Sequence, residues 1–279
     1  MTRRALVLGG GGLTGIAWEW GVLTGLAEAG VDLGDADLVI GTSAGSVVGA
    51  QVANGLAPRE RYEAQLLPPD GELAAALGRG MMFRFALTMV GSRAPQRVRQ
   101  RIGRIALSAD TGVTEADRVG VIESRLPVRE WPADTALHVT AVDTETGAFR
   151  IFDATSGVPL VRAVAASCAV PGVWPPVTID GRRYMDGGMR SAANADLASG
   201  YERIVVLAPI PRGIGPMPGT FTQVEALRRE SEVALLTPDP DAVAAFGKNP
   251  LDPIRRAAAA RAGMIQSSAL VEQVRKVWE

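Results

Sequence analysis

The chain has 279 residues, of which 47% are hydrophobic and 21% are charged, and its formal net charge is −1. This composition excludes an intrinsically disordered chain, and the near-neutral charge provides no overall field that would attract nucleic acid. The one cysteine excludes a disulfide framework, and the one histidine, His138, excludes a metal site built from several histidines. We therefore expect a globular protein with neither a metal site nor a nucleic-acid partner.

The amino terminus resembles a secretory or twin-arginine signal. Arg3 and Arg4 precede a mostly apolar, glycine-rich run over residues 5–18. Four consecutive glycines interrupt this run, so we interpret it as part of the folded protein. No stretch reaches the roughly 18 uninterrupted apolar residues that a membrane-spanning helix needs. We expect a cytoplasmic protein, and the single cysteine fits a reducing compartment.

Two strand–turn–helix units open the chain. Residues 5–8 form a short apolar run that ends in glycines, which is typical of a buried parallel strand. A glycine-rich loop over residues 9–15 leads into a predicted helix over residues 16–29, which Gly30 ends. The pattern then repeats as a strand, a sharp turn and a helix over residues 36–40, 41–45 and 46–53. This alternation predicts an α/β sheet whose loops lie together on one edge.

The middle of the chain, residues 58–120, is mainly helical in pattern, with turns near residues 68–71 and Pro95. Strand patterns then resume over residues 137–142, 149–152 and 203–207. Helical patterns dominate after Phe221 and end in an amphipathic tail. No repeat and no low-complexity linker divides the chain. We therefore expect one domain over residues 1–279, with a helical cap insertion over about residues 58–120.

The glycine-rich loop satisfies the G-x-G-x-x-G spacing with Gly10, Gly12 and Gly15, after a strand and before a helix. Such a loop exposes backbone N–H groups at a helix N-terminus, where negative charge is favoured. A dinucleotide site would also need an acidic residue at the end of the second strand. The available acids lie before that strand or at its start, namely Asp32, Asp35 and Asp37. A dinucleotide-binding oxidoreductase that uses this loop and a purely structural glycine turn both remain open.

The second turn, Gly41-Thr42-Ser43-Ala44-Gly45, matches the G-x-S-x-G pattern of a nucleophile elbow. Gly41 and Gly45 permit the tight turn that presents the hydroxyl of Ser43, and the dipole of the following helix points at that hydroxyl. An ordinary helix N-cap is the alternative role for this serine. A dinucleotide fold has no need of the turn, whereas an acyl-transfer enzyme needs a nucleophile and preorganised N–H donors for the oxyanion. The donors would be the backbone N–H groups of Gly10, Gly11, Gly12 and Ala44.

A third candidate is Asp186, which Gly187 and Gly188 follow. An Asp-Gly-Gly turn is a common structural device, and by itself it indicates no chemistry. Here a hairpin-like run over residues 180–185 precedes it. Such a run would hold the carboxylate at a defined position.

These motifs together resemble the patatin-like phospholipase family. The resemblance rests on residues 6–8 with the glycine loop, on Gly-Thr-Ser-Ala-Gly at 41–45, and on the stretch from Ala169-Val170-Pro171-Gly172 to Asp186-Gly187-Gly188. It covers roughly residues 4–55 and 137–208. It implies a catalytic dyad of Ser43 and Asp186 without a histidine, and an oxyanion hole in the glycine loop. One position departs from the family pattern, because Thr14 stands where a basic residue usually precedes the last glycine of the loop.

We therefore expect an α/β fold, a three-layer α/β/α sandwich with a mostly parallel central sheet and a helical cap. The resemblance implies a serine acyl-ester hydrolase that acts on lipids, of the phospholipase A, lysophospholipase or carboxylesterase type, without a cofactor. A catalytically idle lipid-binding protein of the same fold is the alternative, since fold does not determine function. His138 is then expected to be structural, and Cys168 to be a small core residue. The sequence indicates no oligomeric state.

Residues 84–108 contain six arginines and no acid. Arg97, Arg101 and Arg104 share one helical face, and apolar residues share another. This pattern fits a solvated helix, and it also fits an interfacial helix that contacts anionic lipid head groups. The apolar residues around its start fit either an acyl-chain groove or ordinary core packing: Met81, Met82, Phe83, Phe85, Leu87 and Met89. We expect a lipid or acyl-ester substrate, with peripheral membrane contact through residues 81–105.

Overall fold

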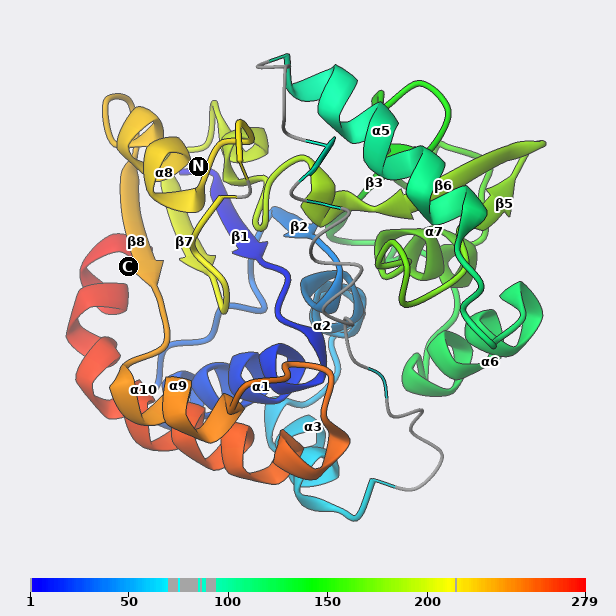
Figure 1. Ribbon diagram of the computed structural model, residues 1–279. Coiled ribbons are helices and arrows are strands. Elements are labelled where there is room, and N and C mark those ends of the chain that lie inside the picture. The colour runs from blue at the N-terminus through cyan, green and yellow to red at the C-terminus, as the bar shows by residue number, and fades with distance from the viewer. Residues whose placement is uncertain (1, 70–74, 76–84, 86, 89–93, 214) are drawn as a thin grey trace.

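A mixed sheet lies between two layers of helices in the computed structural model (Figure 1). The structure describes residues 2–69, 75, 85, 87–88, 94–213 and 215–279. The strands are β1 (Arg4–Leu8), β2 (Leu38–Gly41), β3 (Ala136–Asp143), β4 (Phe149–Phe152), β5 (Val177–Ile179), β6 (Arg182–Asp186), β7 (Arg203–Leu207) and β8 (Glu232–Leu236). The helices are α1 (Gly12–Glu28), α2 (Ala44–Ala53), α3 (Pro58–Leu66), α5 (Pro95–Ser108), α6 (Glu115–Arg125), α7 (Leu160–Ser167), α8 (Thr220–Leu227), α9 (Pro240–Phe246) and α10 (Arg256–Trp278). Short 3₁₀ turns are η1 (Gly187–Met189), η2 (Ala195–Ala198) and η3 (Pro253–Arg255).

The described strands form one 8-stranded sheet in the order β5-β6-β3-β2-β1-β7-β8, with β4 also paired to β3. Each pair of neighbours from β3 to β8 is parallel. The pairs that involve β4, β5 or β6 are antiparallel. This arrangement confirms the expected sandwich with a mostly parallel sheet. It also places the carboxyl ends of β1 and β2 side by side, because Leu8 pairs with Gly41.

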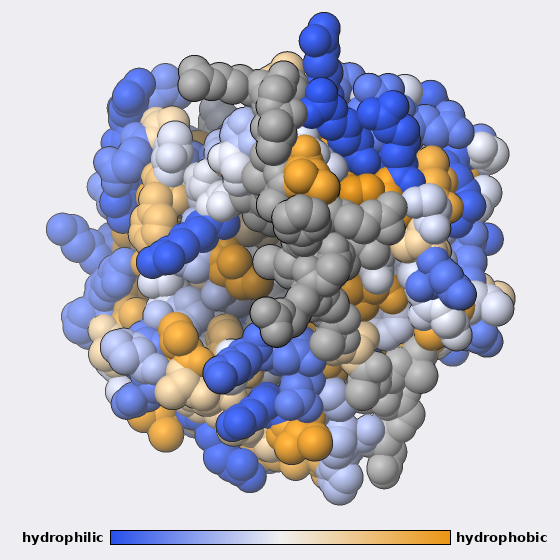
Figure 2. All heavy atoms as spheres, in the orientation of Figure 1, coloured by the Kyte–Doolittle hydropathy of each residue, from blue (hydrophilic) through white to orange (hydrophobic). Residues whose placement is uncertain are grey.

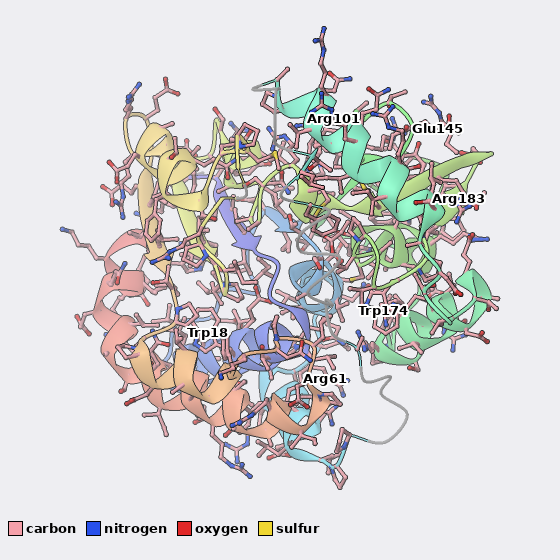
Figure 3. All side chains as sticks on the ribbon, in the orientation of Figure 1. Trp18, Arg61, Arg101, Glu145, Trp174 and Arg183 are labelled. Carbon is pink, nitrogen blue, oxygen red and sulfur yellow. The ribbon has the colours of Figure 1, made fainter. Side chains whose placement is uncertain are left out.

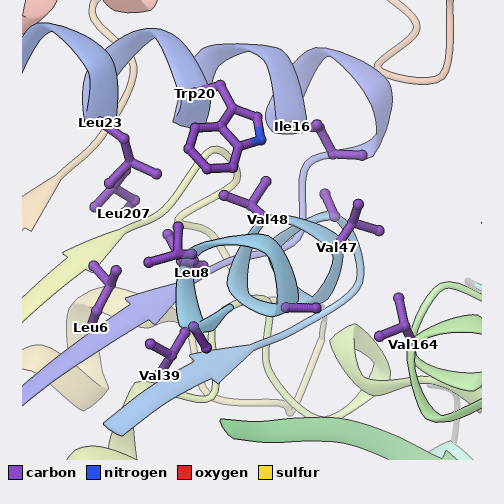
Figure 4. Close-up of a cluster of buried hydrophobic side chains, with 14 of the residues drawn as sticks. Leu6, Leu8, Ile16, Trp20, Leu23, Val39, Val47, Val48, Val164 and Leu207 are labelled. Atoms are coloured by element: carbon purple, nitrogen blue, oxygen red, sulfur yellow. The ribbon is translucent and has the colours of Figure 1, made fainter. Parts of the chain in front are cut away.

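Alternate residues of the central strands enter two separate cores. Leu6 and Leu8 of β1 share a core with residues of α1, α2, α7 and α10, including Val48 (Figure 4). Ala5 and Val7 of the same strand pack with residues of η2 and α8 on the other face. Because helices cover both faces, all four strand residues are buried, which explains the uninterrupted apolar run in the sequence.

The described helices that begin within residues 58–120 pack on both faces of the sheet, as part of its two helical layers. Helix α3 packs against α1 and α10, and α6 packs against α7. Helix α5 forms its own small core, in which Val98 and Ile102 lie with Val142 of β3 and Met185 of β6. The segment expected as an insertion therefore contributes packing to the sandwich itself.

Two elements differ from the expectation. Strand β8 lies in the region where the sequence predicts mainly helices, and it is not predicted, because pairing with β7 along its whole length decides the structure of a short apolar run. Helix α1 begins at Gly12, within the predicted loop. A tertiary contact supports this early start, since the N–H of Thr14 in the first turn donates to Pro250 O at 3.1 Å.

Candidate active site

Pairing along β3 brings the ends of two strands together. Strand β2 ends at Gly41, opposite Val139, and β6 ends at Asp186, opposite Ala141. Both Val139 and Ala141 pair with β4 as well, so β2 and β6 must share the other edge of β3. They approach along that edge from opposite directions and end two positions apart. Ser43, two residues after the end of β2, therefore lies close to Asp186.

The elbow holds Ser43 in an unusual backbone conformation, with φ of 52° and ψ of −119°. Its N–H donates to Ser167 Oγ at 2.9 Å. The N–H of Gly45 donates to Gly9 O at 3.0 Å, which ties the elbow to the loop after β1. A Cβ on Gly45 would run into Leu8 O, so a glycine is needed there. The Ser43 side chain makes no capping hydrogen bond to α2, so the alternative role as a helix N-cap does not apply.

The glycine loop lies directly against the elbow. A Cβ on Gly10 would lie 3.4 Å from Ser43 Cβ. Gly12 has a left-handed φ of 62°, and a Cβ on it would come within 2.6 Å of Pro250 O. Thr14 is fully buried, and its hydroxyl lies 3.4 Å from Pro250 O. The position that is usually basic in the resembled family thus holds the loop in place here and carries no charge.

Backbone N–H donors stand where the two loops enter their helices. The N–H groups of Gly11, Gly12 and Ala44 have no acceptor among the residues that the structure describes, as expected for the first groups of a helix. Gly10 corrects the sequence-based expectation, because its N–H already donates to Ala192 O at 2.7 Å. The available donors beside the elbow are therefore fewer than the four expected.

The carboxyl group of Asp186 is buried, and only 3% of the residue is exposed. It accepts a hydrogen bond at 2.7 Å from the N–H of Gly188, and the nearby Ser43 hydroxyl also stabilises its charged form. Burial raises the pKa of Asp186 to about 6, although the Ser43 hydroxyl, the hydrogen bond from Gly188 and the charge of Arg118 each lower it. An ordinary aspartate has a pKa of about 3.9. The carboxylate is thus more basic than usual and still mostly ionised at neutral pH.

Ser43 and Asp186 both line a cavity of about 440 Å³. This volume is within the range of roughly 300–1,000 Å³ that is typical of ligand pockets. Most of the other lining side chains are apolar, and Phe85, Val173, Met189, Ile210 and Leu251 are among them. Phe85 is thus placed at the cavity, whereas Leu87 is 52% exposed and does not line it. The other members of the apolar group singled out in the sequence lie outside the described residues: Met81, Met82, Phe83 and Met89.

Arg118 of α6 is a site residue that the sequence did not reveal. It lines a second cavity, of about 30 Å³, which Ser43 also lines. Its guanidinium carbon lies 4.1 Å from the centre of the Trp174 ring, and the residue is 4% exposed. Trp174 is labelled in Figure 3. The charge of Arg118 lowers the pKa of Asp186. One signal could have found it: Arg118 lies one turn before Ile122 on the buried face of α6, at a position where an apolar residue is normal.

His138 lies on β3 and Cys168 directly follows α7, and neither side chain is placed for catalysis. His138 lines neither of the two cavities that include Ser43. Burial lowers the pKa of His138, and the charge of Asp153 raises it. Burial raises the pKa of the Cys168 thiol to about 11. This protonated thiol donates to Ser43 O at 3.1 Å and therefore supports the elbow.

The acidic residues that a dinucleotide site would need lie at the amino-terminal ends of β1 and β2, away from the glycine loop. Asp37 directly precedes β2, and its carboxylate accepts the N–H of Arg4, at the start of β1, at 2.7 Å. Asp35 pairs with the Arg4 side chain, and Asp32 accepts the N–H of Gly34. The glycine loop follows the opposite ends of these parallel strands. No carboxylate of this group can reach a ribose held by the loop, which removes the support for the oxidoreductase alternative.

Comparison with known proteins gives a consistent picture. The family model described as Patatin-like phospholipase matches residues 6–199. The protein "Lysophospholipase NTE1" of Phaeosphaeria nodorum is 32% identical over 184 residues, which cover 66% of this chain and 10% of that protein. "Lysophospholipase nte1" of Aspergillus fumigatus is 30% identical over 204 residues, which cover 73% of this chain and 11% of that protein. The chain thus spans about a tenth of the length of these relatives.

Solved structures with lower sequence identity also align with the chain. VipD from Legionella pneumophila aligns with a TM-score of 0.48 and 13% identity, over 98% of this chain and 67% of that one. A structure of full-length ExoU with full-length SpcU from the type III secretion system of Pseudomonas aeruginosa aligns with a TM-score of 0.42 and 18% identity, over 100% of this chain and 53% of that one.

Proposed function

Because this chain belongs to the patatin-like phospholipase family, we propose that it hydrolyses a carboxylic ester of a lipid, with phospholipids or lysophospholipids as the substrate class. One observation carries the proposal. The buried carboxylate of Asp186 and the Ser43 hydroxyl, which lowers its pKa, lie together at the wall of a mainly apolar cavity. A nucleophile, a base and a place for an acyl chain therefore meet at one point.

The proposed reaction begins when Asp186 takes the proton of the Ser43 hydroxyl as its oxygen attacks the ester carbonyl. The negative charge that develops on the carbonyl oxygen is stabilised by the N–H groups of Gly11, Gly12 and Ala44. Asp186 then gives the proton to the departing alcohol, which leaves an acyl-enzyme on Ser43. In the second half, Asp186 takes a proton from water as the water attacks the acyl carbonyl. The proton returns to Ser43 when the carboxylic acid is released.

A fluorophosphonate serine probe tests the proposal directly. We expect the probe to modify Ser43 alone among the serines, because within the described residues it is the serine that lies beside a carboxylate of raised pKa. The modified peptide would be identified by mass spectrometry. Lipid binding without labelling and without ester turnover would instead support the alternative of a catalytically idle lipid-binding protein.

The apolar cavity predicts a preference for longer acyl chains. Each CH₂ group that the cavity removes from water contributes about 0.8 kcal/mol, which corresponds to about a fourfold gain in kcat/KM per group until the cavity is filled. Replacing Phe85 by Ala enlarges the cavity and removes apolar contacts with the acyl chain. The ratio of kcat/KM for the octanoate ester to that for the acetate ester should therefore fall by about tenfold. The measurement is kcat/KM for a series of p-nitrophenyl esters.

Phe221→Ala provides the matched control for the Phe85 variant. Phe221 is 52% exposed on α8 and does not line the cavity, so the same chemical change should leave the chain-length profile unchanged. A wild-type profile that is flat or favours acetate would remove the lipid assignment and leave the hydrolase assignment standing.

The basic face of α5 carries the proposed membrane contact. Arg97 and Arg104 are exposed and form no ion pair within the part of the chain that the structure describes. Hydrophilic residues gather over α5 at the upper right of Figure 2. None of the described helices combines the length and apolar character needed to cross a bilayer. We therefore propose a peripheral contact with anionic lipid, and a cytoplasmic location on the strength of the single, buried cysteine.

Removing the two exposed charges of α5 should weaken binding to anionic vesicles. Each arginine near a membrane surface contributes about 1 kcal/mol, so Arg97→Gln with Arg104→Gln should lower the partition coefficient on phosphatidylserine vesicles about 30-fold. Vesicle sedimentation measures this quantity. The control pair, Arg228→Gln with Arg275→Gln, removes the same net charge from an exposed and a half-buried arginine, each of which is paired with a glutamate. Equal losses for both pairs would show that net charge, and not the α5 face, governs binding.

A further inference from the structure

A buried polar cluster lies beneath the elbow, outside both cavities. At its centre, Asn194 is fully buried and has a left-handed backbone, with φ of 52° and ψ of 38°. It stands at the N-cap position of η2, yet its side chain makes no capping hydrogen bond there. The amide is therefore available for other contacts, and a buried amide is retained only where its hydrogen bonds are satisfied.

The orientation of the Asn194 amide follows from its partners. Its Oδ1 accepts a hydrogen bond from Arg190 Nη1 at 2.8 Å, and a guanidinium can only donate. Its Nδ2 lies 2.9 Å from Ser191 O and 3.3 Å from Gly187 O, and carbonyl oxygens can only accept. A flipped amide would place its NH₂ group against the Arg190 guanidinium and its oxygen against the two carbonyl oxygens. The side chain therefore has one orientation.

The donors of this amide join the two halves of the proposed active site. Nδ2 lies 3.0 Å from the hydroxyl oxygen of Thr42, the residue before Ser43. Its contact with Gly187 O reaches the residue after Asp186. The Thr42 hydroxyl also lies 2.9 Å from the hydroxyl of Thr140 on β3, the strand along which β2 and β6 end. One side chain thus contacts both segments whose ends must meet.

The cluster is itself anchored from α8. Gln223 is 5% exposed, and its Oε1 accepts hydrogen bonds from Ser191 Oγ at 2.8 Å and from the N–H of Ala195 at 3.2 Å. Its Nε2 donates to Asp196, which also pairs with Arg190. The bonds on either side of Asn194 therefore fix its side chain, and a fixed amide can hold two backbone segments at a constant separation.

We propose that Asn194 is a positioning residue, which holds the Asp-Gly-Gly turn against the elbow and so maintains the contact between Asp186 and Ser43. The proposal rests on the proposed function, since it assigns a role within that site. Asn194 touches no substrate and acts only through Thr42 and Gly187. Its effect should be large, because a displacement of about 1 Å between reacting groups can reduce the rate about 100-fold.

Asn194→Gly is the direct test. Glycine accepts the left-handed backbone without strain, so the variant removes the amide and leaves the local conformation allowed. We expect kcat to fall about 100-fold while KM changes less than about threefold. The nearby Ser43 hydroxyl lowers the pKa of Asp186, so a greater separation of the two groups should move the acidic limb of kcat/KM to higher pH. Arg118 and Cys168, the other ionisable groups that interact with Asp186, are unchanged in the variant.

A second variant and a matched control separate positioning from stability. Thr42→Val keeps the shape of the side chain but removes the hydroxyl that accepts from Asn194, and it should shift kcat and the acidic limb in the same directions. Gln266→Ala removes another buried amide, which bonds Trp18 and Thr237 O far from the elbow. That control should lower the melting temperature without moving the acidic limb.

The readout does not depend on turnover alone. Titration of ¹³C-labelled aspartate carboxyl groups by NMR, assigned with Asp186→Asn, follows the same group in the absence of substrate. An upward shift of the Asp186 titration in Asn194→Gly supports the proposal even if the wild-type protein neither hydrolyses esters nor labels at Ser43, a result that would overturn only the proposed function. An unchanged titration in folded Asn194→Gly and Thr42→Val, or the same shift in Gln266→Ala, overturns the positioning role.

Discussion

Replacing Ser43 by Ala should lower kcat/KM for ester hydrolysis by about three orders of magnitude or more, with little change in stability. The loss is large because no other group can form the acyl-enzyme, and the remaining rate would come only from binding and from the N–H donors. Stability should be nearly unchanged, since the Ser43 side chain caps no helix and its N–H bond to Ser167 persists in the variant. The measurements are kcat/KM on a soluble ester and the melting temperature by circular dichroism.

Ser231→Ala is the matched control for the nucleophile. The Ser231 hydroxyl donates to Tyr201 O at 2.6 Å, so its removal costs one hydrogen bond at a distance from both cavities. Activity and probe labelling should stay at the wild-type level in this control. A folded Ser43→Ala protein that keeps more than about a tenth of wild-type activity would reject Ser43 as the nucleophile.

The parts of the site that the sequence predicted are those with a local signal. The elbow and the Asp-Gly-Gly turn can be predicted because short motifs after predicted strands demand particular backbone shapes. The backbone of Ser43 has the unusual φ of 52° and ψ of −119°. The two central strands were found for a similar reason, since burial on both faces leaves an uninterrupted apolar run. Strand β8 also contains a short apolar run, but helical patterns surround it in the sequence, and only its pairing with β7 identifies it as a strand.

Residues that act through distant partners left no such signal. Asn194 and Thr42 are 152 positions apart, and no spacing within one segment reveals their contact. The sequence also does not reveal that the Gly10 N–H is already hydrogen-bonded, because its acceptor, Ala192 O, lies far away in the chain. The raised pKa of Asp186 depends on burial by several elements, which composition does not show. Local motifs therefore indicate the chemistry, whereas tertiary contacts determine which groups remain available for it.

Asp186→Asn should remove most of the activity, again by about three orders of magnitude, while His138→Gln should leave kcat nearly unchanged. An amide cannot take the Ser43 proton, so the asparagine variant lacks a base although its shape is preserved. His138 lines neither cavity that includes Ser43, so its loss removes no contact to the reacting atoms. With one histidine in the chain, no second imidazole can substitute, and the pair of variants separates a Ser-Asp dyad from a triad.

The pH profile supplies the decisive comparison between these two groups. Burial raises the pKa of Asp186 to about 6 and lowers the pKa of His138. The two shifts bring the pKa values of a carboxylate and an imidazole toward each other, so the position of the limb alone does not identify the base. A base must be deprotonated to act, so kcat/KM should fall as the pH drops through about 6, where Asp186 takes up its proton. If the carboxylate is the base, this limb persists unchanged in His138→Gln. If the limb disappears with the imidazole, or if Asp186→Asn keeps substantial activity, the dyad mechanism is wrong for this protein.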